Sequence, residues 1–244
     1  MTVEYIYGFP VLTDAENRIW TDSLFLGYFV DFTPGGSVLD LGAGGGTLCF
    51  IAAGRGASRV VGVDKRAGSC SLLGKSAELS GLPVCAVHAD VKELAMRESF
   101  GAVVCNPPYF APGTGKVSPK AGVARTENTA VFADFARCAK RHLAPGGRFC
   151  FCMRPERFLE TVTDCARAGL YPVRIRYARH SAGKTPFIFA CETSPDVRPT
   201  VFEPDLLLDS AEGAGMYEAY RRPARVGDRA GLPDNDEETR KSFE

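Results

Sequence analysis

Blocks of apolar residues recur along the chain at spacings that predict a repeated strand-and-helix unit. Short, nearly continuous apolar runs occupy 37–41, 59–64, 84–88 and 101–105. The run at 101–105 lacks the alternation of a half-exposed strand and is typical of a parallel strand covered on both faces. The first two runs lead into helices expected at 47–54 and 67–80, the second of which ends at Gly81. Together these units predict an α/β fold with a mostly parallel sheet.

The second half of the chain continues this pattern. A helix is expected over 128–143, followed by a strand over 148–153 and a helix from Pro155 to Gly169. The runs 171–179 and 185–192 predict two last strands. We expect these two strands to form an antiparallel pair at the edge of the sheet.

The two ends of the chain depart from the central pattern. Residues 5–20 predict two short strands around a turn at Asp14 to Asn17, forming a hairpin lid. Thr21 or Asp22 can then cap a helix, although Asp22 could instead reach the amino group of a ligand. After the last strand the apolar pattern decays, and the charged residues 222–244 predict a mobile tail. We therefore expect an N-terminal hairpin and helix lid, a core and a C-terminal extension, over 1–33, 34–193 and 194–244.

The sequence F-G-A-V-V-C-N-P-P-Y-F, from Phe100 to Phe110, brings a buried strand to an abrupt end. Pro107 and Pro108 have no N–H to donate to a neighbouring strand, so Asn106 should lie at the carboxyl end of its strand. Ligands of open α/β sheets bind at that end. An amide carbonyl on a rigid turn, followed by the aromatic Tyr109, suits a planar N–H group. The alternative is that Pro107 and Pro108 form an ordinary Pro-Pro turn with no role in ligand binding.

A glycine-rich turn earlier in the chain predicts a ligand-binding loop. Gly42 and Gly44 follow a strand that runs into Asp40, and glycine lets the backbone approach a ligand closely. The next strand ends at Asp64, whose carboxylate suits the two hydroxyls of a ribose in either an NAD or an S-adenosylmethionine site. The last glycine of the dinucleotide pattern is absent. Asp40 would repel a pyrophosphate but could orient an ammonium group.

Together the motifs D-x-G-x-G-x-G, G-V-D and N-P-P-Y resemble those of S-adenosylmethionine-dependent methyltransferases that modify planar exocyclic nitrogens, over most of 5–192. Within that superfamily the chain most resembles the bacterial tRNA (adenine-N6) methyltransferases that act beside the anticodon. The segment from Arg18 to Leu26, Tyr109-Phe110 and Arg125-Thr-Glu127 also fit that family, whereas Gly45-Gly46-Thr47-Leu48 departs from its usual Thr-Gly-Leu-Leu. The resemblance implies a Rossmann-like class I fold with seven strands, helices on both faces and S-adenosylmethionine as cofactor.

The resemblance also implies roles for individual residues. Asn106 and the backbone carbonyl of Pro107 would accept the two N–H bonds of an exocyclic amine and orient it toward the methyl group, while Tyr109 would stack on the base. Asp90 would accept from the adenine amine of the cofactor, or alternatively cap a short helix over 91–97. Cofactor contacts are expected from Asp40, Gly42, Gly44, Asp64 and Asp90, and substrate contacts from Tyr109, Phe110, Lys116, Lys120 and Arg125.

Composition limits how this protein can bind RNA. Lys plus Arg and Asp plus Glu both total 29, so any RNA surface must be a local patch. We place that patch on Lys116, Lys120 and Arg125 together with Arg174, Arg176 and Arg179. The nine cysteines form no C-x-x-C pair and predict reduced, buried thiols in place of a metal site. With no leader or spanning run in the pattern, we expect a soluble cytoplasmic monomer that binds neither membrane nor metal.

Other methyl acceptors and one non-enzymatic role stay open as alternatives. Guanine N2 in rRNA, adenine in DNA and glutamine N5 in a release factor are also planar nitrogens. Release-factor enzymes usually carry a larger helical domain before the glycine loop, where this chain has about 36 residues, and DNA enzymes carry a separate target-recognition domain. A catalytically silent RNA-binding or scaffold protein is the alternative from another class, against which Asp40, Asp64 and Asn106 argue.

Overall fold

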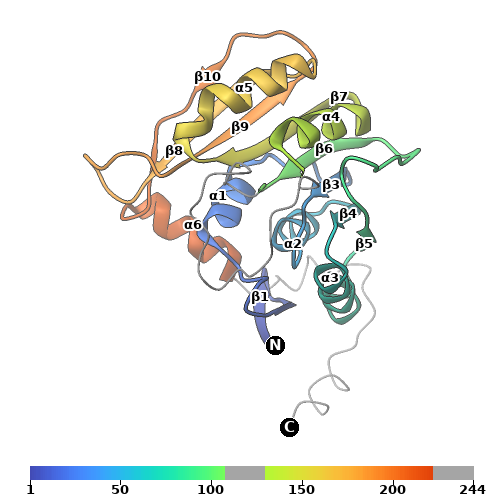
Figure 1. Ribbon diagram of the computed structural model, residues 1–244. Helices are drawn as coiled ribbons and strands as arrows, with labels where there is room; N and C mark the ends of the chain where they lie inside the picture. The colour runs from blue at the N-terminus through green and yellow to red at the C-terminus, as the bar shows by residue number, and fades with distance from the viewer. Residues whose placement is uncertain (108–129, 222–244) are drawn as a thin grey trace.

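The computed structural model describes residues 1–107 and 130–221 (Figure 1). The strands are β1 (Thr2–Ile6), β2 (Phe9–Thr13), β3 (Ser37–Leu41), β4 (Arg59–Asp64), β5 (Val84–His88), β6 (Phe100–Cys105), β7 (Leu143–Met153), β8 (Tyr171–Arg179), β9 (Ile188–Ser194), β10 (Val201–Phe202) and β11 (Leu206–Leu207). The helices are α1 (Thr21–Phe29), α2 (Thr47–Gly54), α3 (Ala67–Ser80), α4 (Phe132–His142), α5 (Phe158–Arg167) and α6 (Ala211–Arg221), with a 3-10 turn, Pro155–Arg157, before α5. The predicted strand-and-helix units of the first half are confirmed.

One large sheet organises the described part of the chain, in the strand order β10-β8-β9-β7-β6-β3-β4-β5, with β11 also pairing with β8. Its strands are parallel except β9, which is antiparallel to both β7 and β8. The predicted α/β class and the antiparallel pair of β8 and β9 are therefore confirmed. The expected seven strands omit β10 and β11, which add parallel to β8. Because each is two residues long, neither leaves an apolar pattern in the sequence.

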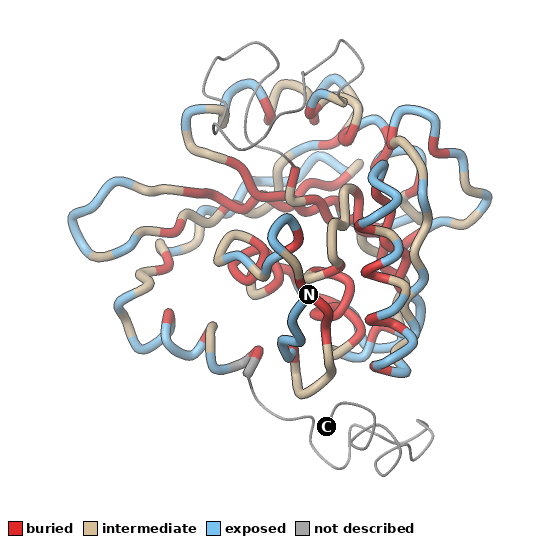
Figure 2. The backbone as a smooth tube through the Cα atoms, turned by 60° about the horizontal axis from the view of Figure 1, so that its bottom comes forward, coloured by how far each residue is buried: buried red, intermediate tan, exposed pale blue. Residues whose placement is uncertain are grey.

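Helices cover both faces of this sheet, with α1, α2, α3 and α6 on one side and α4 and α5 on the other (Figure 1). Alternate residues of β7 show how the two faces are built. Cys150 and Cys152 join the apolar cluster under α1 and α2, whereas Phe149, Phe151 and Met153 join the cluster under α4 and α5. Figure 2 shows burial concentrated in the strands, while the helices turn their outer faces to solvent.

The first hairpin turns earlier than the sequence pattern predicts. β1 and β2 pair antiparallel through Tyr7 and Gly8, whose φ angles are 52° and 80°. The stretch predicted as the hairpin turn forms a separate turn, in which Asp14 Oδ1 accepts from the backbone N–H groups of Glu16 and Asn17. Two turn-forming sequences lie close together here, and the tighter one closes the hairpin.

Helix α1 begins without the side-chain cap expected at its first residues. Trp20 occupies the N-cap position and makes no side-chain cap hydrogen bond. The hydroxyl of Thr21 instead hydrogen-bonds that of Tyr217 in α6 at 3.1 Å, and Tyr220, also in α6, donates to the Leu24 carbonyl at 2.7 Å. A C-terminal segment for which the sequence predicted no element therefore fixes α1 from outside.

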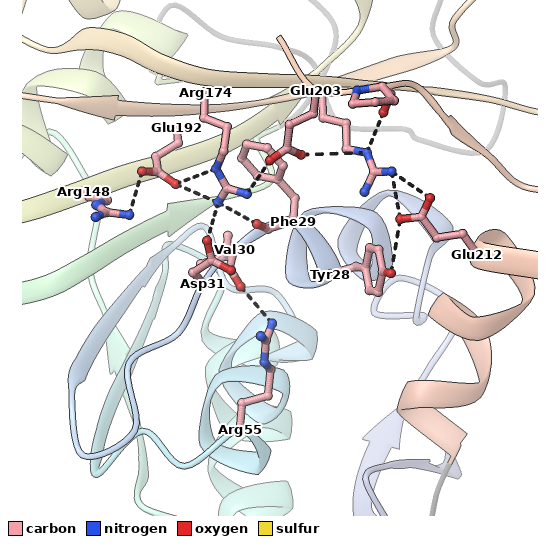
Figure 3. Close-up of polar contacts among 12 residues, drawn as sticks. Tyr28, Phe29, Val30, Asp31, Arg55, Arg148, Arg174, Glu192, Glu203 and Glu212 are labelled. Atoms are coloured by element: carbon pink, nitrogen blue, oxygen red, sulfur yellow. Dashed lines mark hydrogen bonds and ion pairs between the residues drawn. The ribbon is translucent and has the colours of Figure 1, made fainter. Parts of the chain in front are cut away.

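The other end of α1 is held by Arg174 of β8 (Figure 3). Its guanidinium donates to Glu192 at 2.8 Å, to Glu203 at 3.1 Å and to the Phe29 carbonyl at 2.8 Å, and it lies 3.1 Å from the Asp31 carboxylate. The same guanidinium carbon lies 4.1 Å from the centroid of the Phe29 ring. One side chain thus joins the sheet, the end of α1 and the C-terminal strands.

These contacts correct one part of the predicted RNA patch. Arg174, Arg176 and Arg179 lie on one strand, but each is engaged with acidic groups of the protein. Arg176 donates to both carboxylate oxygens of Glu212 at 2.8 and 2.9 Å, and Arg179 pairs with Asp205. Their charges are balanced internally because the C-terminal segment brings these acids alongside β8, so they do not form an unpaired basic surface.

We expect Arg174→Met to lower the free energy of unfolding by about 3–5 kcal/mol, because it strips the buried Glu192 carboxylate of its main partner. Glu192 is 3% exposed, and its remaining ion pair is with the half-exposed Arg148. Urea unfolding measures the loss. Arg198→Met is the matched control, since the Arg198–Asp196 pair is exposed on both sides and should contribute less than about 0.5 kcal/mol. Equal losses in the two variants would contradict the role of Arg174 as the main partner of the buried Glu192 carboxylate.

Candidate active site

The carboxyl ends of four parallel strands bring the predicted site residues to one edge of the sheet. In the strand register Asp40 of β3 lies beside Val104 of β6, and Asp64 of β4 lies beside His88 of β5. Asn106 directly follows β6 at the same edge. A cavity of about 310 Å³ lies at the opposite edge, where the same strands begin, and contains none of the predicted site residues.

The glycine loop has the backbone conformation that its sequence predicts. Gly42, Gly44 and Gly46 have φ angles of 77°, 56° and 90°, a region that disfavours residues with a side chain. A Cβ at Gly46 would also lie 2.2 Å from Leu73 Cδ1. The loop is tied down because the N–H of Gly44 donates to Asp64 Oδ2 at 2.8 Å. The partly buried backbone of this loop is therefore held in a fixed shape between β3 and α2.

Asp64 is buried and organises both the loop and the next turn. Besides Gly44, its carboxylate accepts from the backbone N–H of Arg66 at 2.9 Å and from Arg66 Nε at 3.3 Å. Asn17 Oδ1 in turn accepts from the Ser69 hydroxyl at 2.9 Å and from Arg66 Nη2 at 3.4 Å. Sequence reasoning missed Arg66, Asn17 and Ser69. Arg66 could be suspected from its closeness to Asp64, but no local signal places Asn17 here.

Asp40 carries a carboxylate that the described residues only partly satisfy. The side chain is 1% exposed, Oδ2 accepts from the Cys49 thiol at 3.4 Å, and Oδ1 has no hydrogen-bond partner within the described ranges. Burial raises the pKa of Asp40 to about 7, with the Asp64 charge adding to the rise and the Cys49 thiol opposing it. A buried, half-satisfied carboxylate beside a glycine loop suits a ligand that brings a positive charge.

Asp90 follows β5 at the same edge, but the helix expected over 91–97 is not formed. The Asp90 carboxylate accepts from the N–H of Lys92 at 3.0 Å, and its carbonyl accepts from Glu93 and Leu94. The side chain therefore closes a turn and does not cap a helix. A role toward the cofactor stays a prediction.

Two other elements of the fold hold the amide of Asn106. Its Nδ2 donates to the hydroxyl of Ser23 in α1 at 2.9 Å, and its Oδ1 accepts from the thiol of Cys152 in β7 at 3.2 Å. Sequence reasoning assigned neither Ser23 nor Cys152 to the site. Pro107 is buried next to Asn106. The remaining predicted residues of this region, Tyr109, Phe110, Lys116, Lys120 and Arg125, lie outside the described residues.

Within residues 1–107 and 130–221, no group of three His, Cys, Asp or Glu side chains is placed to hold a metal ion. None of the nine cysteines forms a disulfide, and seven of them are buried. No helix in those two ranges is long and apolar enough to cross a bilayer.

Comparison with known proteins matches residues 17–162 to the methyltransferase small domain family. A curated relative from Dickeya chrysanthemi, named tRNA1(Val) (adenine(37)-N6)-methyltransferase, is 32% identical over 139 residues, covering 54% of this chain and 55% of its own, so this chain spans about half its length. A protein of the same name from Shewanella baltica is 28% identical over 205 residues, covering 82% of this chain and 86% of its own.

Solved structures agree with this fold. A predicted O-methyltransferase from Agrobacterium tumefaciens has a TM-score of 0.63 at 18% identity, covering 83% of this chain and 98% of its own. A 16S rRNA N2 methyltransferase from T. thermophilus, solved in complex with AdoMet and guanosine, has a TM-score of 0.56 at 26% identity, covering 79% of this chain and 49% of its own.

The raised pKa of Asp40 predicts a pH-dependent stability. The unfolded chain loses this proton near pH 3.8, whereas the folded protein keeps it to about pH 7, so between these values ionisation favours the unfolded state. Asp40→Asn lacks this ionisation. The difference in free energy of unfolding between Asp40→Asn and the wild type should therefore shift in favour of the variant by about 2–3 kcal/mol between pH 5 and pH 8. Urea unfolding at both pH values measures this difference. A pH-independent difference would mean that the folded carboxyl titrates normally.

Proposed function

This chain belongs to the methyltransferase small domain family, and we propose that it transfers a methyl group from S-adenosylmethionine to the exocyclic N6 amine of an adenine in tRNA near the anticodon. It is an S-adenosylmethionine-dependent N-methyltransferase. The observation that carries the substrate proposal is the position of Asn106, fixed at the carboxyl end of β6 beside the glycine loop and followed by Pro107. The names of the curated relatives support adenine in tRNA as the target.

The residues at the strand ends fit this cofactor, which supplies a methyl group on a positively charged sulfur. The backbone at Gly42 and Gly44 allows close approach, and Asp64, already held by Gly44, would accept from the ribose. Asp40 offers a buried carboxylate whose Oδ1 lacks a partner in the described residues, which suits the cationic part of the molecule. Asp90 would accept from its adenine amine. Cofactor binding should lower the pKa of Asp40, because a nearby cation favours the carboxylate.

The chemistry asked of the protein is mainly orientation. The exocyclic amine of adenine is a weak nucleophile because its lone pair is delocalised into the ring. The Asn106 side-chain carbonyl and the Pro107 backbone carbonyl would accept the two N–H bonds, aim the lone pair at the methyl group and stabilise the charge that develops on nitrogen. The nitrogen then loses a proton readily to solvent, so no strong base is needed.

Residues outside the described ranges complete this proposal. Tyr109 would stack on the target base, which must leave any base stack before it reacts. Phe110 would add to that apolar surface, while Lys116, Lys120 and Arg125 would contact phosphates. The predicted RNA patch is thereby reduced to Lys116, Lys120 and Arg125, because the arginines of β8 pair with acidic residues of the protein.

Guanine N2 is the second candidate target, favoured by the likeness to the rRNA N2 methyltransferase solved with guanosine. Both targets are planar exocyclic amines, and the Asn106 carbonyl suits either. Methyl transfer to total RNA, followed by nucleoside mass spectrometry, separates them. We expect N6-methyladenosine in the tRNA fraction; N2-methylguanosine in rRNA would overturn the adenine proposal and keep the enzyme class.

Asn106→Ala removes the proposed acceptor while both prolines keep the turn. Turnover should fall by about two to three orders of magnitude, the usual effect of losing one group that stabilises developing charge. Asn106→Asp restores an acceptor and should recover part of the activity. Calorimetry should show unchanged cofactor affinity in both variants. Methylation by Asn106→Ala at the wild-type rate would contradict the proposed mechanism.

Substituting Lys116, Lys120 and Arg125 together by alanine should weaken RNA binding. The slope of a plot of log affinity against log salt concentration should also become less steep, by about one unit per lost phosphate contact. Cofactor affinity should stay the same. Filter binding or fluorescence anisotropy at several salt concentrations measures both quantities.

The matched control for that variant removes three exposed positive charges elsewhere, at Lys140, Arg167 and Arg198. It changes the net charge equally but should leave RNA affinity and its salt slope near the wild-type values. If the two triple variants behave alike, binding depends on net charge and not on the segment after the N-P-P-Y motif.

A further inference from the structure

The amide of Asn106 is held at both ends by side chains that reach it from different elements. Ser23 lies in the first turn of α1, 83 residues earlier in the chain, and Cys152 lies near the end of β7, 46 residues later. Ser23 is 9% exposed and Cys152 is fully buried. Neither contact follows from the N-P-P-Y motif, because both depend on how α1 and β7 pack beside β6.

The two contacts have different consequences for the amide. A serine hydroxyl can donate or accept, so Ser23 fixes the position of the amide but tolerates either orientation. The Cys152 thiol lies near two oxygen acceptors, Asn106 Oδ1 at 3.2 Å and the Asp22 carbonyl at 3.8 Å, which places it as a donor. Sulfur is a weak acceptor, so a flipped amide would exchange a thiol-to-carbonyl bond for a weaker one. The thiol therefore favours the orientation with Oδ1 as the oxygen.

We propose that Ser23 and Cys152 are positioning residues that hold Asn106 in the orientation in which its carbonyl accepts from the target amine. This inference rests on the proposed function, because it assigns the two side chains a task toward the acceptor role of Asn106. A carbonyl oxygen has two lone pairs, so accepting from the thiol is compatible with accepting from a substrate. Holding the amide beforehand removes the entropy cost of ordering it during the reaction.

Ordinary core packing is the competing explanation for Cys152, and β7 contains the control that separates the two. Cys150 is two residues away on the same face of the same strand, is 2% exposed and packs in the same apolar cluster. Changing either cysteine to alanine removes the same atom from the same layer. Among the described contacts, Cys152 reaches Asn106 and Cys150 does not.

The first test observes the amide itself and needs no substrate. The side-chain ¹⁵N–¹H₂ signals of Asn106 are identified as the pair that disappears from the NMR spectrum of Asn106→Ala. In Cys152→Ala and Ser23→Ala these signals should shift or broaden, whereas in Cys150→Ala they should stay at the wild-type positions. Unchanged signals in both test variants would overturn the proposal whatever reaction the enzyme catalyses.

The second test is kinetic. Cys152→Ala and Ser23→Ala should each lower kcat by about three- to tenfold, the size of one lost hydrogen bond, with KM for RNA and cofactor affinity unchanged. Cys150→Ala should keep the wild-type kcat, and Cys152→Ser, which retains a donor, should recover most of the loss. In the Asn106→Ala background, Cys152→Ala should have no further effect, because residues that act through one group are not additive.

These outcomes distinguish a failure of the positioning role of Ser23 and Cys152 from a failure of the proposed function. If Asn106→Ala is inactive while Cys152→Ala and Ser23→Ala have wild-type kcat, the positioning role is wrong and the proposed function stands. If Asn106→Ala is fully active, the acceptor mechanism is wrong. The NMR experiment then still decides whether Ser23 and Cys152 hold the Asn106 amide. Thermal unfolding of Cys152→Ala and Cys150→Ala shows whether any difference in kcat is merely a difference in stability.

Discussion

Helix α1 is the element whose placement the site depends on, and ionic and polar contacts fix it at both ends. At its C-terminal end the Arg174 guanidinium donates to the Phe29 carbonyl and pairs with Asp31 and the buried Glu192 (Figure 3). At its N-terminal end Ser23 reaches Asn106. A helix of nine residues packed only by apolar contacts could slide along the sheet, whereas these directional contacts define one position. The geometry of the edge that carries the candidate site therefore depends partly on an ion network at the opposite edge of the sheet.

The two buried carboxylates at the strand ends differ in how far the protein satisfies their oxygens. Asp64 is satisfied by Gly44 and Arg66, so it shapes the loop before any ligand arrives. Asp40 keeps one oxygen without a partner in the described residues, and its pKa is raised by burial. Such a group destabilises the fold where it is ionised and gains a partner when a cation binds. Stability is thus lowered at the same position where a positively charged cofactor would be recognised.

Sequence patterns predicted the elements whose cause is local. The strands beginning at Ser37 and Arg59 are buried on both faces, so their composition alone identifies them, whereas the strand beginning at Val84 lies at the edge of the sheet and is only partly buried. The early hairpin turn was misplaced because two turn-forming sequences compete within a dozen residues. β10, β11 and α6 were missed, since two-residue strands have no periodicity and α6 forms against α1 and β8. The pairing of Arg174, Arg176 and Arg179 was missed for the same reason, as their acidic partners are distant in sequence.

The candidate site shows the same division between local and distant causes. Asn106, Asp40 and Asp64 could be named from the sequence because each stands next to a local signal. Asn106 precedes two prolines, Asp40 precedes the glycine loop, and Asp64 ends an apolar strand. How Asn106 is oriented could not be, since Ser23 and Cys152 reach it from two other elements. A motif of four residues predicts a carbonyl acceptor at the strand end. The side-chain amide of Asn106 can, however, rotate about its Cβ–Cγ bond, which exchanges the positions of the oxygen and the nitrogen. The packing of α1 and β7 against β6 supplies the contacts that select one orientation, so the orientation of this amide depends on residues outside the motif.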